Sequence, residues 1–266
     1  MSAELTAGLE AVSRACTYLL DAYDRFEVIA NAPADITTEA DRQAQEIILK
    51  TLHDYFPTDA LCAEESTSLA QSAPSTGPRL WIVDPIDGTR GFARKNGEFS
   101  VMIAFVNEGT LEVGIVAQPI FGRLTYAERG RGCWRQDKNE AAVACRVTAV
   151  SELSRATLTQ SRSKESTAPS PLVTALAPAK IVETYSAGVK LALIARGEAD
   201  IYLNDYHAFH DWDIAAGHIL VTEAGGRVSG IQNQELLYGL PGAWQRHGLV
   251  ATNGVLHDRV IERLQS

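Results

Sequence analysis

The chain has 266 residues, a formal net charge of −9 and a pI near 5.2. This length suffices for one large domain or two smaller lobes with a substantial buried core, so a disordered chain is not expected. The acidic balance argues against a groove for a nucleic acid polymer, which would need a basic stripe to displace counterions from phosphates.

Cysteine content and hydropathy indicate the environment of the protein. The 4 cysteines are widely spaced, form no Cys-x-x-Cys pair for zinc and are too few for a disulfide scaffold in a chain of this length. The N-terminus lacks the basic start and unbroken apolar core of a signal peptide, and no apolar run approaches the ~18 residues of a membrane span. These features predict a cytoplasmic protein with reduced thiols, and they do not indicate membrane association.

Apolar residues at helical spacing predict two helices in the first part of the chain. The first extends from Leu5 to Tyr23, and the second follows an N-cap at Thr38 and ends at Pro57. Short strands are predicted at 60–63 and 80–83, with a mobile loop rich in Ser, Ala, Thr, Gly and Pro at 67–78 between them. Both helices are expected to pack on a sheet.

The middle of the chain changes to strand and turn. Residues 100–134 predict an antiparallel meander, which is unlike a βαβ array. A C-terminal α/β lobe is predicted at 145–266, after an N-terminal α+β lobe with metal-binding loops at 1–144. Its predicted strands are 157–160, 199–203 and 248–251, and its predicted helices are 172–176, 187–195, 212–223 and 255–264.

The densest polar motif stands at the end of an apolar strand. Residues 81–89 read Trp-Ile-Val-Asp-Pro-Ile-Asp-Gly-Thr, so the strand delivers Asp84 and Asp87 to a Gly-Thr turn. Hard cations such as Mg²⁺ take oxygen ligands, and backbone amides beside Gly88 can hold a phosphate oxygen at a helix start. The alternative is a plain surface turn, because Asp, Pro and Gly are all turn formers.

Three further acidic segments also have structural alternatives. Glu64 and Glu65 end the short strand at 60–63, but adjacent acids are common on exposed loops. Asp41, in segment 35–41, and Asp213 lie in the first turns of predicted helices, where a carboxylate can satisfy amides and the helix dipole without a catalytic role. Taken singly, none of these segments decides between structure and catalysis.

Taken together, the acidic segments resemble the inositol monophosphatase superfamily. Its first signature, similar to W-x-x-D-P-x-D-G-T-x-x-F, is matched at 81–92, and its second, W-D-x-A-A-G…E-A-G-G, at 212–226. The D-x-T-x-x-D segment at 35–41 and the Glu64-Glu65 pair fall in the family's order. The resemblance implies an α+β fold, a two-lobed layered α/β/α/β/α sandwich of the inositol monophosphatase and fructose-1,6-bisphosphatase type, with the site between the lobes.

The resemblance also implies a Mg²⁺-dependent phosphomonoesterase with two or three ions. Glu64, Asp84 and the Ile86 carbonyl would bind the first ion. Asp84, Asp87 and Asp213 would bind the second, and Glu64 would help to hold a third. A metal-bound water loses its proton more easily and attacks phosphorus in line, so no covalent enzyme intermediate is required.

The remaining roles are carried over in the same way. Gly88 and Thr89 would contact the phosphate, and Asp41 would pair with Thr89 to orient the attacking water. The implied catalytic residues are therefore Asp41, Glu64 and Thr89.

Residues 87–100 look most like the 3′(2′),5′-bisphosphate nucleotidase branch of the superfamily, where a D-G-T-R-E-F…R-N-G-E-F run is usual. Residues 186–190, Ser-Ala-Gly-Val-Lys, resemble its G-S-A-G-x-K segment, and Lys190 would reach the second phosphate of a nucleotide bisphosphate. Ser161-Arg162-Ser163 resembles its S-R-S segment, followed here by Lys164 where a histidine is frequent. The implied substrate contacts are Asp87, Gly88, Thr89, Ser186, Lys190 and Asp213.

Two departures bear on the substrate more than on hydrolysis: Gly91 replaces the usual acid, and Tyr185 stands where a glycine often precedes the serine. The leading hypothesis is hydrolysis of adenosine 3′,5′-bisphosphate to AMP and phosphate. The alternatives are an inositol monophosphatase or related sugar or histidinol phosphatase and, from a different class, a catalytically idle sensor. Lithium inhibition is implied by the resemblance, and a homodimer and a monomer are both open.

Three histidines, His207, His210 and His218, cluster near Asp213 and raise the alternative of a transition-metal site. A hard phosphatase centre prefers oxygen ligands, and the spacing of these histidines does not repeat i, i+4. We therefore interpret them as structural or as supporting neighbours of the site.

Overall fold

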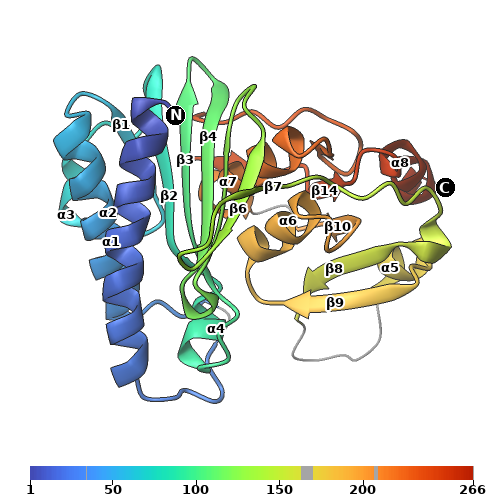
Figure 1. Cartoon of the computed structure of the whole chain (residues 1–266), viewed down its shortest axis with the longest axis horizontal. Coiled ribbons are helices and arrows are strands. Elements are labelled where there is room, and N and C mark those ends of the chain that lie inside the picture. Colours follow the sequence, from blue (N-terminus) through green and yellow to red (C-terminus); the bar gives the residue numbers. More distant parts are fainter. Residues whose placement is uncertain (34, 163–169, 207–208, 266) are drawn as a thin grey trace.

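The computed structural model of the chain describes residues 1–33, 35–162, 170–206 and 209–265. Its elements form alternating layers of helices and sheets (Figure 1). Helices α1 (Ala3–Arg25) and α2 (Glu39–Tyr55) cover one face of a seven-stranded sheet, and α6 (Ala187–Ala195) and α7 (Asp211–Glu223) contact its other face. A five-stranded sheet follows, and α5 (Pro171–Leu176) and α8 (His257–Gln265) cover its outer face. The predicted α/β/α/β/α layering is confirmed.

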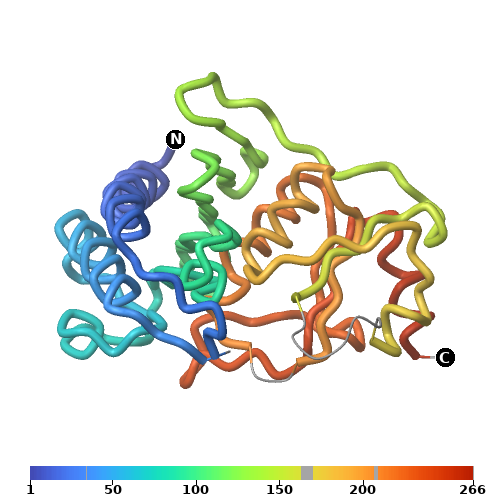
Figure 2. The backbone as a smooth tube through the Cα atoms, turned by 90° about the horizontal axis from the view of Figure 1, so that it is seen from below, coloured from blue at the N-terminus to red at the C-terminus, as the bar shows by residue number. Residues whose placement is uncertain are grey.

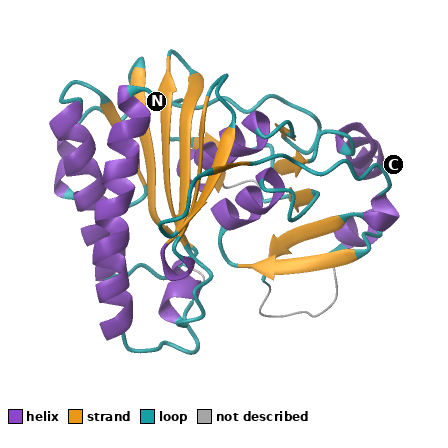
Figure 3. Ribbon diagram, in the orientation of Figure 1, coloured by secondary structure: helices purple, strands orange, loops and turns teal. Residues whose placement is uncertain are grey.

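The larger sheet contains the predicted meander and three further strands, one of which is parallel to its neighbour (Figure 3). Strand β1 (Ala60–Ala63) is parallel to β2 (Arg79–Asp87), and every later neighbour pair is antiparallel. The later strands are β3 (Ser100–Asn107), β4 (Thr110–Gln118), β5 (Arg123–Glu128), β6 (Cys133–Asp137) and β7 (Val143–Ala144). Because helices cover both faces, β2 and β3 are almost wholly buried, which explains their nearly continuous apolar sequence.

The smaller sheet mixes directions. Strands β10 (Ile201–Asn204), β8 (Thr157–Ser161) and β9 (Lys180–Thr184) are parallel neighbours. Strand β14 (Leu249–Thr252) runs antiparallel to both β10 and β12 (Arg227–Ser229). A separate two-stranded ladder joins β11 (Phe209–His210) to β13 (Trp244–Gln245). The periodicity did not predict β9, β11, β12 or β13.

Short helical segments fill the connections. The predicted loop at 67–78 contains α3 (Ser68–Ser72), because Leu69 and Ala70 pack against the core under α1 and α2. Helix α4 (Thr89–Ala93) follows directly on β2. Two 3₁₀ turns, η1 (Pro119–Phe121) and η2 (Leu153–Arg155), complete the described helical segments.

The two halves of the chain share their packing. Strand β7 ends the first sheet at Ala144, but α7, from the C-terminal half, packs on β2, β3 and β4 of that sheet. A tube view from below shows the N-terminal helices and α8 on opposite sides of the molecule (Figure 2). The division into lobes at residue 144 stays a prediction.

Two predictions from composition can be compared with the coordinates. All 4 cysteines, Cys16, Cys62, Cys133 and Cys145, are free thiols. Within the described ranges, no helix combines the length and the apolar character that crossing a bilayer requires.

Candidate phosphatase site

A β-bulge at the end of β2 positions the central acids. Asp84 pairs with Met102 and Asp87 with Ser100, so Pro85 and Ile86 together oppose a single residue of β3. In a regular strand, residues three apart point to opposite faces, and the extra residue of a bulge reverses this alternation. The bulge therefore directs both carboxylates to the same face at this end of the sheet.

A cavity of about 470 Å³ opens at this end of the sheet. Glu64, which follows β1, lines it together with Asp84 and Asp87 of the first signature and Asp213 at the start of α7. Ile86, Gly88 and Thr89 also line it. The tertiary structure thus brings together every predicted metal-binding residue, although three of the four acids come from residues 64–87 and the fourth from residue 213.

Burial and mutual repulsion shape the electrostatics of these acids. Burial raises the pKa of Asp84 well above its usual value, and neighbouring Glu64 and Asp87 raise it further. Burial and Asp213 raise the pKa of Glu64 to about 8, although a side-chain hydrogen bond with Asp84 opposes the shift. Burial also raises the pKa of Asp213 to about 7. Burial and like charge thus disfavour the ionised forms of Glu64, Asp84 and Asp213, an effect that a bound cation would relieve.

These residues fit a hard divalent cation by their chemistry. All are oxygen donors, and Asp84, which is 2 % exposed, has a buried Oδ1 with no hydrogen-bond partner among the described residues. A buried, unpartnered carboxylate oxygen is costly unless something binds it. The acids are not yet arranged as ligands: within the described ranges, no three His, Cys, Asp or Glu side chains form a group that could hold a metal ion as they stand.

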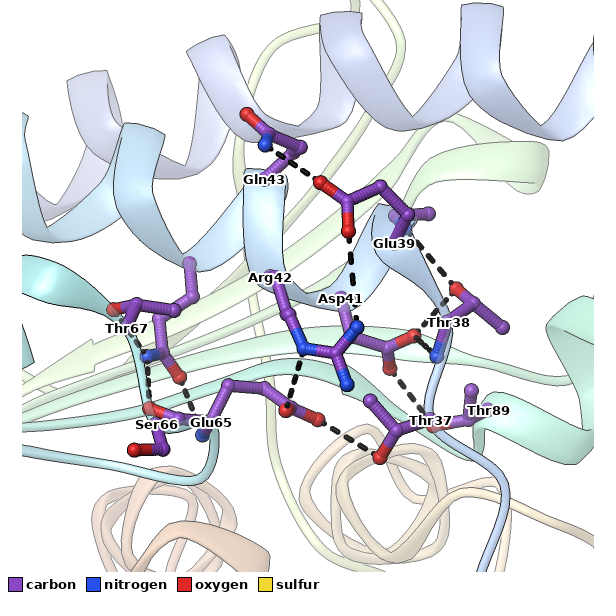
Figure 4. Close-up of polar contacts among 12 residues, drawn as sticks. Thr37, Thr38, Glu39, Asp41, Arg42, Gln43, Glu65, Ser66, Thr67 and Thr89 are labelled. Carbon is purple, nitrogen blue, oxygen red and sulfur yellow. Dashed lines mark hydrogen bonds and ion pairs between the residues drawn. The ribbon is translucent and has the colours of Figure 1, made fainter.

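Asp41 and Thr89 form the predicted pair (Figure 4). The Thr89 hydroxyl lies 3.0 Å from Asp41 Oδ1 and 3.0 Å from the Ile86 carbonyl oxygen. Asp41 Oδ2 accepts hydrogen bonds from the Thr38 amide and hydroxyl, in the capping box of α2. The Asp41 carboxylate therefore caps α2 through one oxygen and contacts Thr89 through the other. Burial raises the Asp41 pKa to about 6. Thr89 lines the cavity, whereas Asp41 is not among the lining residues.

Asp87 links the end of β2 to the start of α6. Its Oδ1 accepts a hydrogen bond from the Ala187 amide at 3.0 Å, and its Oδ2 accepts one from the Gly188 amide at 2.6 Å and one from the Ser186 hydroxyl. The Ser100 hydroxyl also donates to Oδ2, at 3.2 Å. Ser186 is the N-cap of α6 and is fully buried, so it contacts Asp87 and does not line the cavity.

Gly88 is required by its surroundings. Its φ of +91° is in the left-handed region, and a Cβ there would lie 2.8 Å from the Glu98 carbonyl oxygen and 3.2 Å from the Ser186 amide nitrogen. Any side chain would collide with the Glu98 carbonyl and crowd Ser186, the N-cap of α6.

Lys190 lies beneath the cavity wall. Its side chain is 1 % exposed, and its ammonium donates to the Ser161 hydroxyl at 3.1 Å and to the carbonyls of Thr184 and Tyr185 at 3.2 and 3.3 Å. Burial lowers its pKa to about 8. These contacts occupy the three ammonium donors, so the geometry favours support of the 184–185 segment over direct contact with a substrate.

The family comparison agrees with this site. The sequence profile of the Inositol monophosphatase family matches residues 2–266. The chain belongs to the inositol monophosphatase family. Members of this family are phosphatases that hydrolyse phosphate monoesters, and the family is generally metal-dependent.

Relatives within the inositol monophosphatase family carry several different names. A fructose-1,6-bisphosphatase/inositol-1-monophosphatase of Thermotoga maritima is 30% identical over 86% of this chain and 82% of its own length. A histidinol-phosphatase of Chlorobaculum parvum is 33% identical over 98% of this chain and 96% of its own length. Among solved structures, the IMPase of Thermotoga maritima superposes with a TM-score of 0.82 at 27% identity, covering 99% of this chain and 97% of its own. The predicted superfamily and fold are confirmed.

The cavity is also lined by residues that the sequence did not assign to the site. These are Asp35, Ile36, Thr37, Arg90, Ser161, Arg162 and Tyr185. Arg90 directly follows the first signature's Thr89, and Tyr185 is one of the departures from the branch pattern. Both positions were therefore visible in the sequence, but only as details of the branch comparison.

The histidines have structural partners. His210 stacks on Trp212 with ring centroids 4.2 Å apart, and its amide donates to Asp213 Oδ2 at the start of α7. His218 lies 2.7 Å from the Tyr238 hydroxyl. The structural interpretation holds for these two, whereas His207, Ser163 and Lys164 lie outside the described residues.

Proposed function

We propose that this phosphatase hydrolyses a small phosphate monoester at the acidic cavity, with two or three Mg²⁺ ions held by Glu64, Asp84, the Ile86 carbonyl, Asp87 and Asp213. The observation that supports this most is the buried Oδ1 of Asp84, which lies near other acids and has no hydrogen-bond partner among the described residues. Mg²⁺ bound there would acidify a water and stabilise charge on the phosphate and leaving oxygens.

The chain's own residues orient the water. The Thr89 hydroxyl is within hydrogen-bonding distance of Asp41 and of the Ile86 carbonyl, so its hydrogen is directed away from the cavity while its oxygen can accept a hydrogen bond from a water. Asp41 acts through Thr89 and does not itself reach the cavity. It holds the threonine hydroxyl in the accepting orientation and can receive the proton as water attacks.

For the substrate, we propose adenosine 3′,5′-bisphosphate, which would be hydrolysed to AMP and phosphate. Two features of the cavity support a leaving group that is both charged and planar: the arginines Arg90 and Arg162, and the aromatic ring of Tyr185. An inositol ring offers neither a second anion nor a flat face. Lys190, which the branch comparison assigned to the second phosphate, contributes by holding the Tyr185 segment.

Histidinol phosphate is the second candidate. Relatives named histidinol-phosphatase are 34% and 33% identical to this chain. Its imidazole could also stack on Tyr185, but its amino group is cationic and unsuited to a wall with two arginines.

Phosphate release with Mg²⁺ against a panel tests both candidates: adenosine 3′,5′-bisphosphate, histidinol phosphate, fructose 1,6-bisphosphate and inositol 1-phosphate. The highest kcat/KM for the nucleotide is the expected outcome, and a higher value for another ester would refute the nucleotide proposal. Binding of Mg²⁺ without turnover of any ester would favour the idle sensor. Lithium inhibition and a cytoplasmic location belong to the same proposal, and assays with LiCl and cell fractionation test them. Sedimentation distinguishes a homodimer from a monomer, both of which stay open.

A further inference from the structure

Arg90 is anchored at the cavity but leaves part of its guanidinium unpaired. Its Nε and Nη2 are buried and have no hydrogen-bond partner among the described residues. The guanidinium lies over the Tyr185 ring, with Cζ 5.1 Å from the ring centroid, and the residue lines the same cavity as the acids. Buried donors without an acceptor are costly, and a guanidinium fork matches phosphate or carboxylate oxygens.

The Tyr185 ring under Arg90 is held from several sides. Arg94 donates a hydrogen bond to the Tyr185 hydroxyl, and its Cζ lies 5.6 Å from the ring centroid. Arg162 lies 5.8 Å from the same centroid and is fixed by two hydrogen bonds to Glu98. Lys190 bonds the Tyr185 carbonyl from below. Tyr185 is therefore a supported aromatic surface, and Arg162 has carboxylate partners that Arg90 lacks.

Arg79 shows what a structural arginine looks like in this protein. It also lies over an aromatic ring, with Cζ 4.7 Å from the Phe105 centroid. However, its Nε, Nη1 and Nη2 all donate to carboxylates, those of Asp59 and Glu4. Arg90 has the same ring contact without the acid. The difference indicates that the missing acceptor of Arg90 is supplied by a ligand.

We propose that Arg90 determines specificity by binding a second anionic group on the leaving part of the substrate, while Tyr185 supports its planar part. The inference rests on the proposed phosphatase site, because Thr89, the neighbouring residue, faces the scissile phosphate in that proposal. The substrate class is a phosphate monoester whose leaving group carries its own phosphate or carboxylate. The acidic half of the cavity would repel this second anion, so Arg90 also sets the orientation of the substrate.

A matched pair of esters tests this role. Adenosine 3′,5′-bisphosphate and 3′-AMP share the scissile 3′-ester and differ only in the 5′-phosphate. We expect wild-type kcat/KM to favour the bisphosphate by about ten- to hundredfold, and Arg90→Gln to bring this ratio close to one, because a charged hydrogen-bonded pair typically carries that much discrimination. Arg90→Lys should restore part of the ratio. Arg25→Gln, which removes an exposed ion pair with Asp21 on α1, is the control and should leave the ratio unchanged.

Equilibrium binding separates this inference from the proposed hydrolysis. Calorimetric titration of AMP and of adenosine into metal-free protein needs no turnover. We expect Arg90→Gln to weaken AMP binding about tenfold or more while the affinity for adenosine stays the same. Equal losses for both ligands, equal losses of kcat/KM for both esters, or a wild-type protein that does not distinguish AMP from adenosine would each overturn the role of Arg90. Absence of all ester hydrolysis with AMP discrimination intact would refute the proposed function alone.

Discussion

Two buried aspartates in this phosphatase have almost the same exposure and opposite surroundings. Asp59 is 3 % exposed and accepts hydrogen bonds from Arg79 Nε at 2.8 Å, from Arg79 Nη2 at 3.0 Å and from the Trp81 indole at 3.1 Å. Asp84 is 2 % exposed, has an unpartnered oxygen and is surrounded by other acids. Both belong to the packing around β2. Burial alone therefore does not distinguish a structural acid from a functional one, but its partners do.

The largest expected effect tests the functional member of this pair. Asp84→Asn keeps the shape of the side chain and removes the charge that we propose to bridge the ions. Because metal-held charge supplies several kcal/mol to phosphoryl transfer, we expect kcat/KM to fall on the order of 10³-fold or more in the phosphate-release assay. The free energy of unfolding of the metal-free variant should stay the same or rise, since repulsion with Glu64 and Asp87 is relieved. An Asp84→Asn variant with nearly wild-type activity would refute the assignment of Asp84 as a metal ligand.

For Asp59, the structural aspartate of the pair, we expect a loss of stability and no loss of catalytic rate. Asp59→Ala leaves Arg79 and the Trp81 indole without their acceptor. Removing one partner of a buried pair typically costs about 3 to 5 kcal/mol, and we expect the lower end because the Arg79 side chain is 36% exposed. Urea denaturation measures this loss. The folded fraction of the Asp59→Ala variant should keep the wild-type kcat. A large drop in kcat with unchanged stability would contradict the structural role of Asp59.

A third substitution sharpens the role of the Asp41–Thr89 pair. Thr89→Val is nearly isosteric and removes the hydroxyl that we propose to orient water. Positioned proton acceptors typically contribute about 10²- to 10⁴-fold, so we expect kcat to fall about 10²-fold with a smaller change in KM. Thr89→Ser restores the hydroxyl and should recover most of the rate. Equal rates for the valine and serine variants would exclude the hydroxyl from the reaction.

The smallest expected effect concerns acid stability away from the cavity. His257 is 0 % exposed, contacts Ser229 and Thr252, and has its pKa lowered to about 4 by burial and by Arg227. In the unfolded chain its pKa is near 6.5, so the unfolded state binds more protons between pH 6.5 and 4 and stability falls as the pH drops through this window. The contribution lost by pH 5 is about 2 kcal/mol.

Comparison with His257→Gln isolates this contribution, because the carboxylates of the cavity titrate alike in both proteins. The difference in unfolding free energy between wild type and variant should shrink by about 2 kcal/mol from pH 8 to pH 5. A difference that does not change with pH would show that His257 takes up its proton equally in the folded and unfolded states, and would contradict the lowered folded-state pKa.

Local sequence patterns determined much of the fold before any tertiary contact was known. The helix at Ala187–Ala195 and the strand at Ala60–Ala63 were predicted with the bounds that the structure shows, and the meander was predicted in its order. Periodicity and capping are properties of neighbouring residues, so they are legible in one sequence. Strands β9 and β12 and the ladder of β11 with β13 were missed, because their pairing depends on partners more than 20 residues away along the chain.

The acids of the cavity were identified by their order in the motifs, but their arrangement required the tertiary structure. The bulge at Pro85 and Ile86 and the position of α7 bring Asp213 to the acids of β2, and no local pattern specifies that approach. Likewise, the sequence indicated a cation at Lys190, whereas folding buried Lys190 under Tyr185 and left Arg90 unpaired at the cavity. The sequence determines which side chains are charged. Whether a charged side chain can bind a ligand depends on the hydrogen-bond acceptors that the fold places beside it.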